Sequence, residues 1–476
     1  MNLSPLCVLS PEDIEAIHEA TLDILASTGV RVQSARMLGL LAEKGLDVDT
    51  QTGIVRFPRG SIEDAIGSTP RSFEVFGREG EPAFVLGDGT PRVAAGHNAI
   101  FWVDSETGET RPSTVRDVEQ FAHLCELLPN IDMIGIPVMP QDVPVAGATL
   151  LYGVRACIQN SRKPIYYSTD RPEVNRAIIR MLERAFAGDL SRQVYGITQV
   201  SPTSPLWWEE GVLEQIIETV QTGVPIAILP EPNAGVSAPF TLAGLLTVNN
   251  AECLSGIAMI QLLKPGAKAL YANSWTTTDM RSGAALVGSC ETTICRIAGA
   301  QLARFYRLPC HTTAPNSDNH AHDEQNAWEK TLSQFCSIAA GNDLIVNCGM
   351  FATGMTCSHE QLVMDDEISA MARRIVAGVR VNADTIAADL IKSVGPAGTG
   401  YITSDHTMRW LRSDEYLTPR LAVRGSRTLW ESAGAKDTYQ IARDEVTRLL
   451  QQPAAPLDAA RLEGVGRVVD EFVKKG

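Results

Sequence analysis

Eight short apolar segments, each followed by a stretch with helical periodicity, recur through the middle of this 476-residue chain. They occupy residues 92–96, 132–138, 164–168, 194–200, 224–230, 268–273, 309–313 and 344–348. Strands that alternate with helices predict a parallel sheet, because each parallel strand needs a crossover before the next one. Eight such units over roughly 290 residues match an α/β fold of the (β/α)8 TIM type, a barrel that typically takes about 250 residues.

The competing α/β topology is a doubly wound open sheet, which usually has fewer strands and a glycine-rich phosphate loop. No Gly-x-Gly-x-x-Gly follows a predicted strand, and no Gly-x-x-x-x-Gly-Lys-Ser/Thr occurs. We therefore predict a catalytic barrel at residues 91–380, preceded by an N-terminal α/β cap at 1–90 and followed by a C-terminal helical extension at 381–476. The extension would pack on the barrel or on a second copy, so we expect a homo-oligomer.

Two helix starts are marked by capping residues. Ser10 is followed by Pro11 and Asp13, and Thr114 is followed by Asp117 three positions later. A hydroxyl at the cap and an acid in the first turn both satisfy free backbone N–H groups. These signals predict helices that begin at about residues 11 and 115.

Charge and composition exclude several classes of function. The formal charge is −15 and the pI about 5.1, which argues against a broad nucleic-acid surface and suits a cationic ligand. No apolar run is long enough to cross a bilayer, and residues 1–10 lack the pattern of a signal peptide. Ten cysteines occur without a Cys-x-x-Cys pair, which is typical of reduced thiols, so we expect a cytoplasmic protein that binds no membrane.

If the barrel is correct, function lies just after each strand. These positions are polar and aromatic and carry few cations. They include Glu231 at the end of an apolar strand, and Trp207 and Trp275 after two others. Such a rim suits a quaternary ammonium held by cation–π contacts of about 0.5–2 kcal/mol per ring. The alternative is that the tryptophans fill the space between strand ends and helices.

The loop after the seventh strand is rich in histidine and carboxylate. His320 and His322 flank one alanine, with Asp318 nearby, and His97 follows the first strand. Such a group can bind a metal in hydrolytic barrels, which leaves a metal-dependent TIM-barrel hydrolase as one alternative function. Solvated loop histidines are the other interpretation, and we predict no metal.

Several motifs resemble one known family. Gly96, His97 and Asn98, followed by residues 104–111 and 128–132, resemble the opening of the trimethylamine methyltransferase family. Further similar segments are residues 235–244, 250–252, 279–283, 318–329 and 358–367. The resemblance extends from about residue 10 to about residue 450, and the order and spacing of the motifs are specific.

The resemblance implies a (β/α)8 barrel that moves a methyl group from an amine to the cobalt of a separate corrinoid protein. Trimethylamine members carry pyrrolysine, whereas this sequence has only the twenty standard residues. It therefore looks like the non-pyrrolysine branch, whose substrates include glycine betaine and related quaternary amines. No Asp-x-His-x-x-Gly corrinoid signature occurs, so the corrinoid (cobalamin) cofactor would be supplied by a partner protein and not be permanently bound.

We combine these expectations into one site hypothesis. The ammonium would lie among Tyr167, Trp207, Trp275 and Phe351, with Glu231 supplying negative potential. Arg281 or a rim amide would bind a substrate carboxylate. The set of expected site residues is completed by His97, Asn98 and His359.

His359 has two interpretations. It could steer the methyl group or meet the corrin, or it could be an interface histidine. A non-catalytic quaternary-amine binding protein remains the second alternative function.

Overall fold

The computed structural model describes residues 5–396, 398 and 400–475. Its centre is a sheet of eight parallel strands in the order β6-β18-β17-β14-β13-β11-β10-β9. Ala94 of β6 bridges Met133 beside β9, and the Ala95 amide donates to the Met133 carbonyl at 3.1 Å, which joins the two edges. All eight predicted strands are confirmed: β6 (Arg92–Ala95), β9 (Ile134–Gly135), β10 (Ile165–Ser168), β11 (Gly196–Val200), β13 (Ile226–Ile228), β14 (Ala269–Asn273), β17 (Cys310–Thr313) and β18 (Leu344–Cys348).

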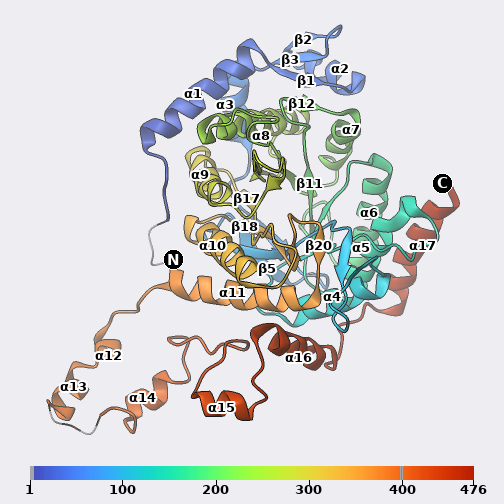
Figure 1. The fold of residues 1–476 in the computed structure, drawn as a ribbon. Coiled ribbons are helices and arrows are strands. Elements are labelled where there is room, and N and C mark those ends of the chain that lie inside the picture. The colour runs from blue at the N-terminus through green and yellow to red at the C-terminus, as the bar shows by residue number, and fades with distance from the viewer. Residues whose placement is uncertain (1–4, 397, 399, 476) are drawn as a thin grey trace.

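Eight helices surround this barrel (Figure 1). They are α4 (Val115–Leu127), α5 (Thr149–Asn160, after the short turn η1 at Ala146–Ala148), α6 (Pro172–Ala185), α7 (Glu210–Thr219), α8 (Leu242–Leu263), α9 (Cys290–Tyr306), α10 (Glu324–Ala340) and α11 (His359–Ala377). The Thr114 capping box at the start of α4 forms as predicted. Among the described residues, α8 alone has the length and composition of a membrane span, but 78% of that window is buried inside the protein.

The N-terminal segment covers one side of the barrel and explains why α8 is buried over most of its length. It comprises α1 (Pro11–Ser27), β1 (Val30–Val32), α2 (Ala35–Glu43), β2 (Asp47–Asp49), β3 (Ile54–Arg56) and α3 (Arg59–Ser68). Helices α1 and α3 pack on α8 and bury its outer face. The small sheet of this segment has the order β12-β1-β3-β2. Strand β12 (Trp207–Trp208) lies in the loop after the barrel strand β11, so this pairing joins that loop to the cap.

A hairpin closes the amino-terminal end of the barrel. Its strands are β4 (Phe73–Phe76) and β5 (Pro82–Leu86), and the Phe76 amide donates to the Val194 carbonyl at 2.8 Å. Val75 and Leu86 belong to the same buried cluster as inward-facing strand residues such as Ile197. Only the carboxyl end of the barrel is therefore left for a site.

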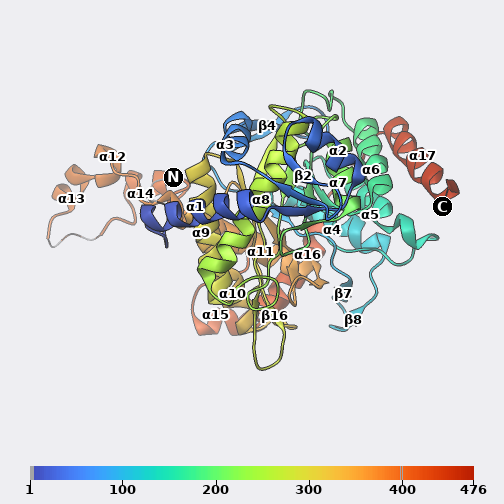
Figure 2. The same ribbon diagram turned by 90° about the horizontal axis from the view of Figure 1, so that it is seen from above.

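Small hairpins rise from that carboxyl end. They are formed by β7 (Phe101–Val103) with β8 (Thr110–Arg111), by β15 (Thr277–Thr278) with β16 (Ala285–Leu286), and by β19 (Met350–Phe351) with β20 (Thr356–Cys357). Figure 2 shows β7, β8 and β16 on the side of the molecule opposite β4. These hairpins are the walls around the barrel mouth.

The C-terminal part begins after α11. Four short helices follow, α12 (Ala383–Ile386), α13 (Ala388–Val394), α14 (Asp405–Trp410) and α15 (Arg427–Ser432), and then α16 (Thr438–Leu450) and α17 (Ala459–Lys475). Helix α17 packs on α5 and α6, and α16 packs on α11 and α4. The short helices project away from the body in Figure 1.

Candidate active site at the barrel mouth

A hydrogen-bonded group fills the barrel just below its mouth. The Tyr166 hydroxyl on β10 donates to the Gln199 side-chain carbonyl on β11 at 2.7 Å. Nε2 of His97 lies 3.0 Å from the same oxygen. The carbonyl oxygen of the Gln199 side chain can only accept hydrogen bonds. With this orientation of the Gln199 amide, His97 must therefore carry its proton on Nε2. Nδ1 of His97 is then an acceptor, and it has no partner among the described residues.

His311 on β17 completes this group. Its ring stacks on Tyr166 with centroids 5.1 Å apart and an interplanar angle of 15°. The ring is fully buried, and neither nitrogen has a hydrogen-bond partner within the described part of the chain. Burial lowers the pKa of His311 to about 3 and that of His97 to about 4. Both imidazoles are therefore neutral at physiological pH.

Glu231 is the carboxylate of the mouth. It follows β13 two positions after Leu229, whose side chain faces into the barrel, so Glu231 lies on the same inner side. Desolvation by the surrounding barrel raises the pKa of this carboxyl to about 7. The residue is nevertheless exposed to the space in the mouth, so water reaches the carboxylate and reduces that effect. The charge of Glu231 also raises the pKa of Tyr166, after burial of the phenol.

Of the expected site residues, the structure brings His97, Asn98 and Glu231 to the mouth. Asn98 is left-handed at φ 63°, and its side-chain amide donates to the Ser168 carbonyl on β10 at 3.3 Å. The remaining expected residues are Tyr167, Trp207, Trp275, Arg281, Phe351 and His359, and the structure places them elsewhere.

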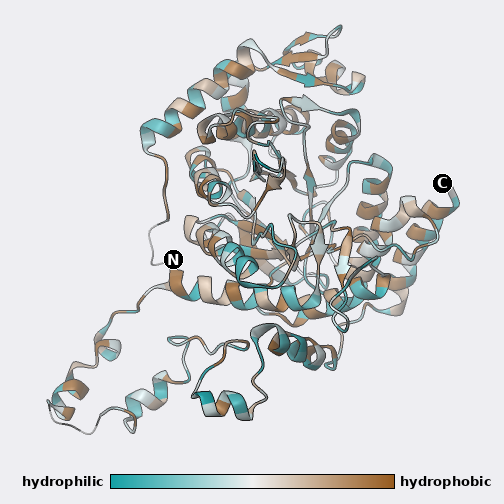
Figure 3. Ribbon diagram, viewed as in Figure 1, coloured by the Kyte–Doolittle hydropathy of each residue, from teal (hydrophilic) through white to brown (hydrophobic). Residues whose placement is uncertain are grey.

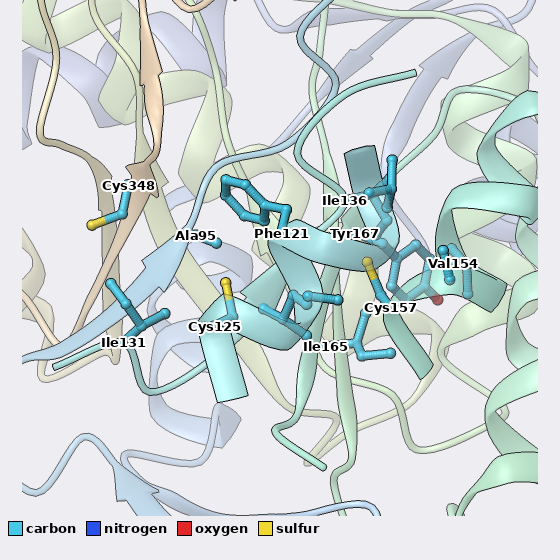
Figure 4. Packing of buried hydrophobic residues seen from close by; sticks show 14 of the residues in the cluster. Ala95, Phe121, Cys125, Ile131, Ile136, Val154, Cys157, Ile165, Tyr167 and Cys348 are labelled. Carbon is cyan, nitrogen blue, oxygen red and sulfur yellow. The ribbon is translucent and has the colours of Figure 1, made fainter. Parts of the chain in front are cut away.

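Tyr167 points out of the barrel. Its hydroxyl donates to the Asn175 side chain on α6 at 3.2 Å. Figure 4 shows the ring among Val154 and Cys157 of α5 in the layer between strands and helices. The neighbouring Tyr166 is the inward residue, because successive side chains on a strand alternate between the two faces.

The two tryptophans also lie outside the mouth. Trp207 belongs to β12, and the Arg31 guanidinium of the cap lies 5.3 Å from its ring centroid. Trp275 is 1% exposed and packs in the cluster that includes α8 and α9. The tryptophans fill interfaces, as the alternative interpretation held, and the expected aromatic cage is not assembled.

The last three expected residues, His359, Phe351 and Arg281, lie outside the barrel mouth. Nε2 of His359 is 3.2 Å from the Asp117 carbonyl oxygen, and its ring packs edge-on against Trp102 at 4.6 Å. This position makes His359 an interface histidine. Phe351 contacts the His322 ring at 4.6 Å. Arg281 lies between β15 and β16 with 93% of its side chain exposed.

The histidine-rich loop does not gather metal ligands. Nε2 of His322 lies 3.0 Å from the Ser358 hydroxyl, and His320 is exposed. Asp318 accepts from the Val287 and Gly288 amides at 2.8 and 2.9 Å. The described residues include no group of three or more His, Cys, Asp or Glu side chains that could hold a metal.

Comparison with known proteins gives the family. A sequence model described as trimethylamine methyltransferase (MTTB) matches residues 1–475. The chain belongs to the trimethylamine methyltransferase family.

Relatives in this family have two kinds of name. Trimethylamine methyltransferase MttB of Desulfitobacterium hafniense (strain DSM 10664 / DCB-2) is 33% identical over 448 residues, covering 94% of this chain and 90% of that protein. Glycine betaine methyltransferase of the same species (strain Y51) is 29% identical over 427 residues, covering 89% and 88%. The chain is thus a methyltransferase, as the resemblance implied.

A solved structure supports the fold. The monomethylamine methyltransferase of Methanosarcina barkeri aligns with a TM-score of 0.50 at 15% identity, covering 94% of this chain and 96% of that one. At this identity the likeness concerns the fold alone.

If the methyl acceptor is carried by a separate protein, the methyltransferase needs an open end that the acceptor can reach, and it needs no pocket that holds a cofactor permanently. The hairpin β4–β5 closes one end of this barrel, and the rim hairpins surround the other. Glu231 is exposed at that open end, so the mouth is accessible to a small substrate. The residues present would fit the binding of a small methyl donor at this open end.

Proposed function

We propose that the protein moves a methyl group from a quaternary amine, glycine betaine in the first instance, to a separate corrinoid protein. The observation that carries this proposal is the mouth itself, where the exposed Glu231 carboxylate lies close enough to Tyr166 to raise the pKa of that phenol, and where the imidazoles of His97 and His311 are neutral. A permanently cationic substrate complements that charge. The relatives named for trimethylamine and for glycine betaine support the substrate class.

The choice of a quaternary amine also follows from leaving-group chemistry. A quaternary amine loses a methyl group and leaves as a neutral tertiary amine, whereas a tertiary amine must first be made cationic. The corrinoid would supply Co(I), the nucleophile that accepts the methyl group. Only the twenty standard residues occur in this chain, so no pyrrolysine is present to activate a tertiary amine. The barrel residues then need only to bind and orient the substrate and to limit water.

Glu231 would hold the ammonium. A unit ion pair at about 4 Å is worth about 4 kcal/mol at an effective dielectric constant near 20 and about 1 kcal/mol in bulk water. A mouth that water reaches lies between these limits, which corresponds to about 10- to 100-fold in affinity. Arg281 remains our proposal for the substrate carboxylate. It lies outside the mouth, but its hairpin is tied to the loop after Glu231, because the Thr278 hydroxyl donates to the Asn233 side chain at 2.6 Å.

The location we propose is the cytoplasm. All ten cysteines are free thiols, and a strongly reducing Co(I) partner also requires a reducing compartment.

The test is anaerobic. The protein is mixed with free cob(I)alamin and a panel of quaternary and tertiary amines, and methylcobalamin is followed by its absorbance. We expect methylation with glycine betaine, none with trimethylamine, and at least a tenfold loss of kcat/KM in Glu231→Gln. Binding of betaine by calorimetry without any methylation would instead identify a non-catalytic binding protein and refute the proposal.

A further inference from the structure

The eighth barrel strand along the chain, β18, contains one irregular residue close to the mouth. Two residues that flank it lie in different layers, Val346 in the cluster inside the barrel and Cys348 in the cluster between strands and helices. In a regular strand, residues two apart share a face. The two flanking residues also align with consecutive residues of β6, so Asn347 between them has no partner on that strand. Asn347 therefore forms a β-bulge.

The backbone of Asn347 is strained. Its φ is 144°, a region that residues other than glycine rarely adopt. The sequence of β18 is Leu-Ile-Val-Asn-Cys, so Asn347 is also its one hydrophilic residue on the hydropathy scale that colours Figure 3. Bulges and strained residues are common next to active sites, where they redirect a side chain. The bulge thus indicates a role for Asn347 beyond packing.

The exposed part of Asn347 faces the mouth. Within β18, Asn347 is the one residue that is not buried. Helices α10 and α11 contact the outer side of this strand, so the open space beside Asn347 is the inside of the barrel mouth. The neighbouring strand lies very close, because a Cβ on Gly96 would be 3.2 Å from the Cα of Asn347. Asn347 therefore lies beside the segment that carries His97 and Asn98.

A chain of hydrogen bonds fixes the orientation of the Asn347 amide. Nδ2 of Asn316 donates to the Thr313 carbonyl at 3.1 Å. A carbonyl oxygen only accepts, so this contact leaves Oδ1 of Asn316 as an acceptor. Nδ2 of Asn347 donates to that Oδ1 at 2.8 Å. The second N–H of the Asn347 amide and its Oδ1 have no partner within the described part of the chain, so both can bind a ligand.

The position of Asn347 relative to Glu231 suits a ligand with two opposite charges. In the order of the sheet, β17 and β14 separate β18 from β13, the strand that precedes Glu231. In a barrel of eight strands, this separation places the two side chains on nearly opposite sides of the mouth. A carboxylate is repelled by Glu231 and accepts from an amide N–H. An ammonium and a carboxylate in one small molecule therefore fit between Glu231 and Asn347.

We propose that Asn347 is a specificity-determining residue that donates its second N–H to the carboxylate of the substrate, while Glu231 holds the ammonium. This inference rests on the proposed function and deepens it. Arg281 lies outside the mouth and would attract the carboxylate from a distance, whereas Asn347 orients it by a directional hydrogen bond. The mouth then selects betaines over quaternary amines that have no carboxylate.

The test compares two methyl donors, glycine betaine and tetramethylammonium, which has no carboxylate. The variant is Asn347→Gly, because glycine adopts a φ of 144° freely and removes only the amide. We expect kcat/KM for glycine betaine to fall about 10- to 100-fold, the range for a hydrogen bond to a charged group. The value for tetramethylammonium should change less than about twofold, because that donor makes no contact with the amide.

A second variant and a control complete the set. Asn347→Asp should lower kcat/KM for glycine betaine further than Asn347→Gly does, because a carboxylate replaces the donor and repels the substrate carboxylate. The matched control is Asn160→Asp, which adds the same charge at the end of α5, just before β10 and so at the closed end of the barrel. It should leave the kcat/KM of both donors unchanged.

Calorimetry with the same two ligands separates this proposal from the proposed function, because binding requires no methyl transfer. A preference for glycine betaine that is present in the unmodified protein and lost in Asn347→Gly supports the proposal, even if no methylcobalamin forms. Equal losses of affinity for both ligands would identify a structural role for Asn347 and overturn the proposal. An unchanged preference for glycine betaine in Asn347→Gly would also overturn it, and methyl transfer that persists would then leave the proposed function intact.

Discussion

Lys330 provides the sharpest stability prediction. Its side chain is fully buried on α10, and Nζ lies 3.0 Å from Oδ2 of Asp365 on α11. Nζ also donates to the Pro315 carbonyl at 3.2 Å and to the Met350 carbonyl. Lys330 thereby ties the ends of β17 and β18, next to the mouth, to the helix layer. Lys330→Met would leave one buried carboxylate and two carbonyl oxygens without this donor.

Breaking a buried ion pair by removing one partner costs about 3–5 kcal/mol. The entropy of unfolding is about 2.1 cal/mol/K per residue, which gives roughly 1 kcal/mol/K for this chain. Lys330→Met should therefore lower Tm by about 3–5 °C in scanning calorimetry. The double variant Lys330→Met with Asp365→Leu should recover at least half of that loss, because no unpaired charge is left.

The matched control is Lys392→Met. Lys392 pairs with Asp389 at 3.4 Å on the surface, where the two side chains are 77% and 100% exposed. Exposed pairs contribute little, so its Tm should change by less than about 1 °C. A Tm for Lys330→Met within 1 °C of the unmodified protein, or a double variant less stable than the single one, would refute the reasoning about the buried pair.

Three further predictions concern the mouth and the thiols. The KM for glycine betaine should rise as pH falls below 7, because desolvation raises the pKa of the Glu231 carboxyl above its usual range and the carboxylate takes up a proton there. Glu231→Gln should flatten this pH profile, and a profile that stays steep would contradict the role of the carboxylate. Tyr166→Phe should reduce kcat/KM about tenfold, whereas Tyr167→Phe should change only Tm, because of these two side chains only Tyr166 points into the barrel interior. Equal losses of kcat/KM in the two variants would contradict that assignment. A thiol reagent should label Cys7 and Cys290 rapidly in the native protein, because both are exposed, whereas the buried thiols should react only after unfolding.

The strands could be predicted because parallel strands buried on both faces read as continuous apolar runs between Gly and Pro residues. Their lengths were less accurate. The predicted strand at 132–138 is only β9 (Ile134–Gly135) in the structure, and that at 224–230 is β13 (Ile226–Ile228). Pro137 follows the first, and Pro225 and Pro230 flank the second. Proline cannot donate to the sheet, so it ends the pairing.

The direction of side chains could not be predicted in the same way. In a strand with one polar face, the alternation of polar and apolar residues shows which side chains face inward. A strand buried on both faces is apolar throughout and gives no such signal. Tyr166 and Tyr167 are equally apolar neighbours, and Tyr167 was chosen for the site although Tyr166 faces inward. His311 lies within a strand of otherwise small residues, and its polarity was the one signal that could have identified an inward position. Glu231 was expected at the mouth because it is an acid at the end of an apolar strand, and its position two residues after the inward Leu229 agrees with that expectation.

The charge of the mouth bears on which amines the site can use. His97 and His311 stay neutral because they are desolvated, so neither imidazole adds a positive charge that competes with the substrate for Glu231. A protonated tertiary amine can give its proton to a carboxylate whose pKa is raised, and both partners then lose their charge. A quaternary ammonium has no proton to give. Its charge, and with it its attraction to Glu231 and its ability to release a methyl group, therefore persists in the bound state.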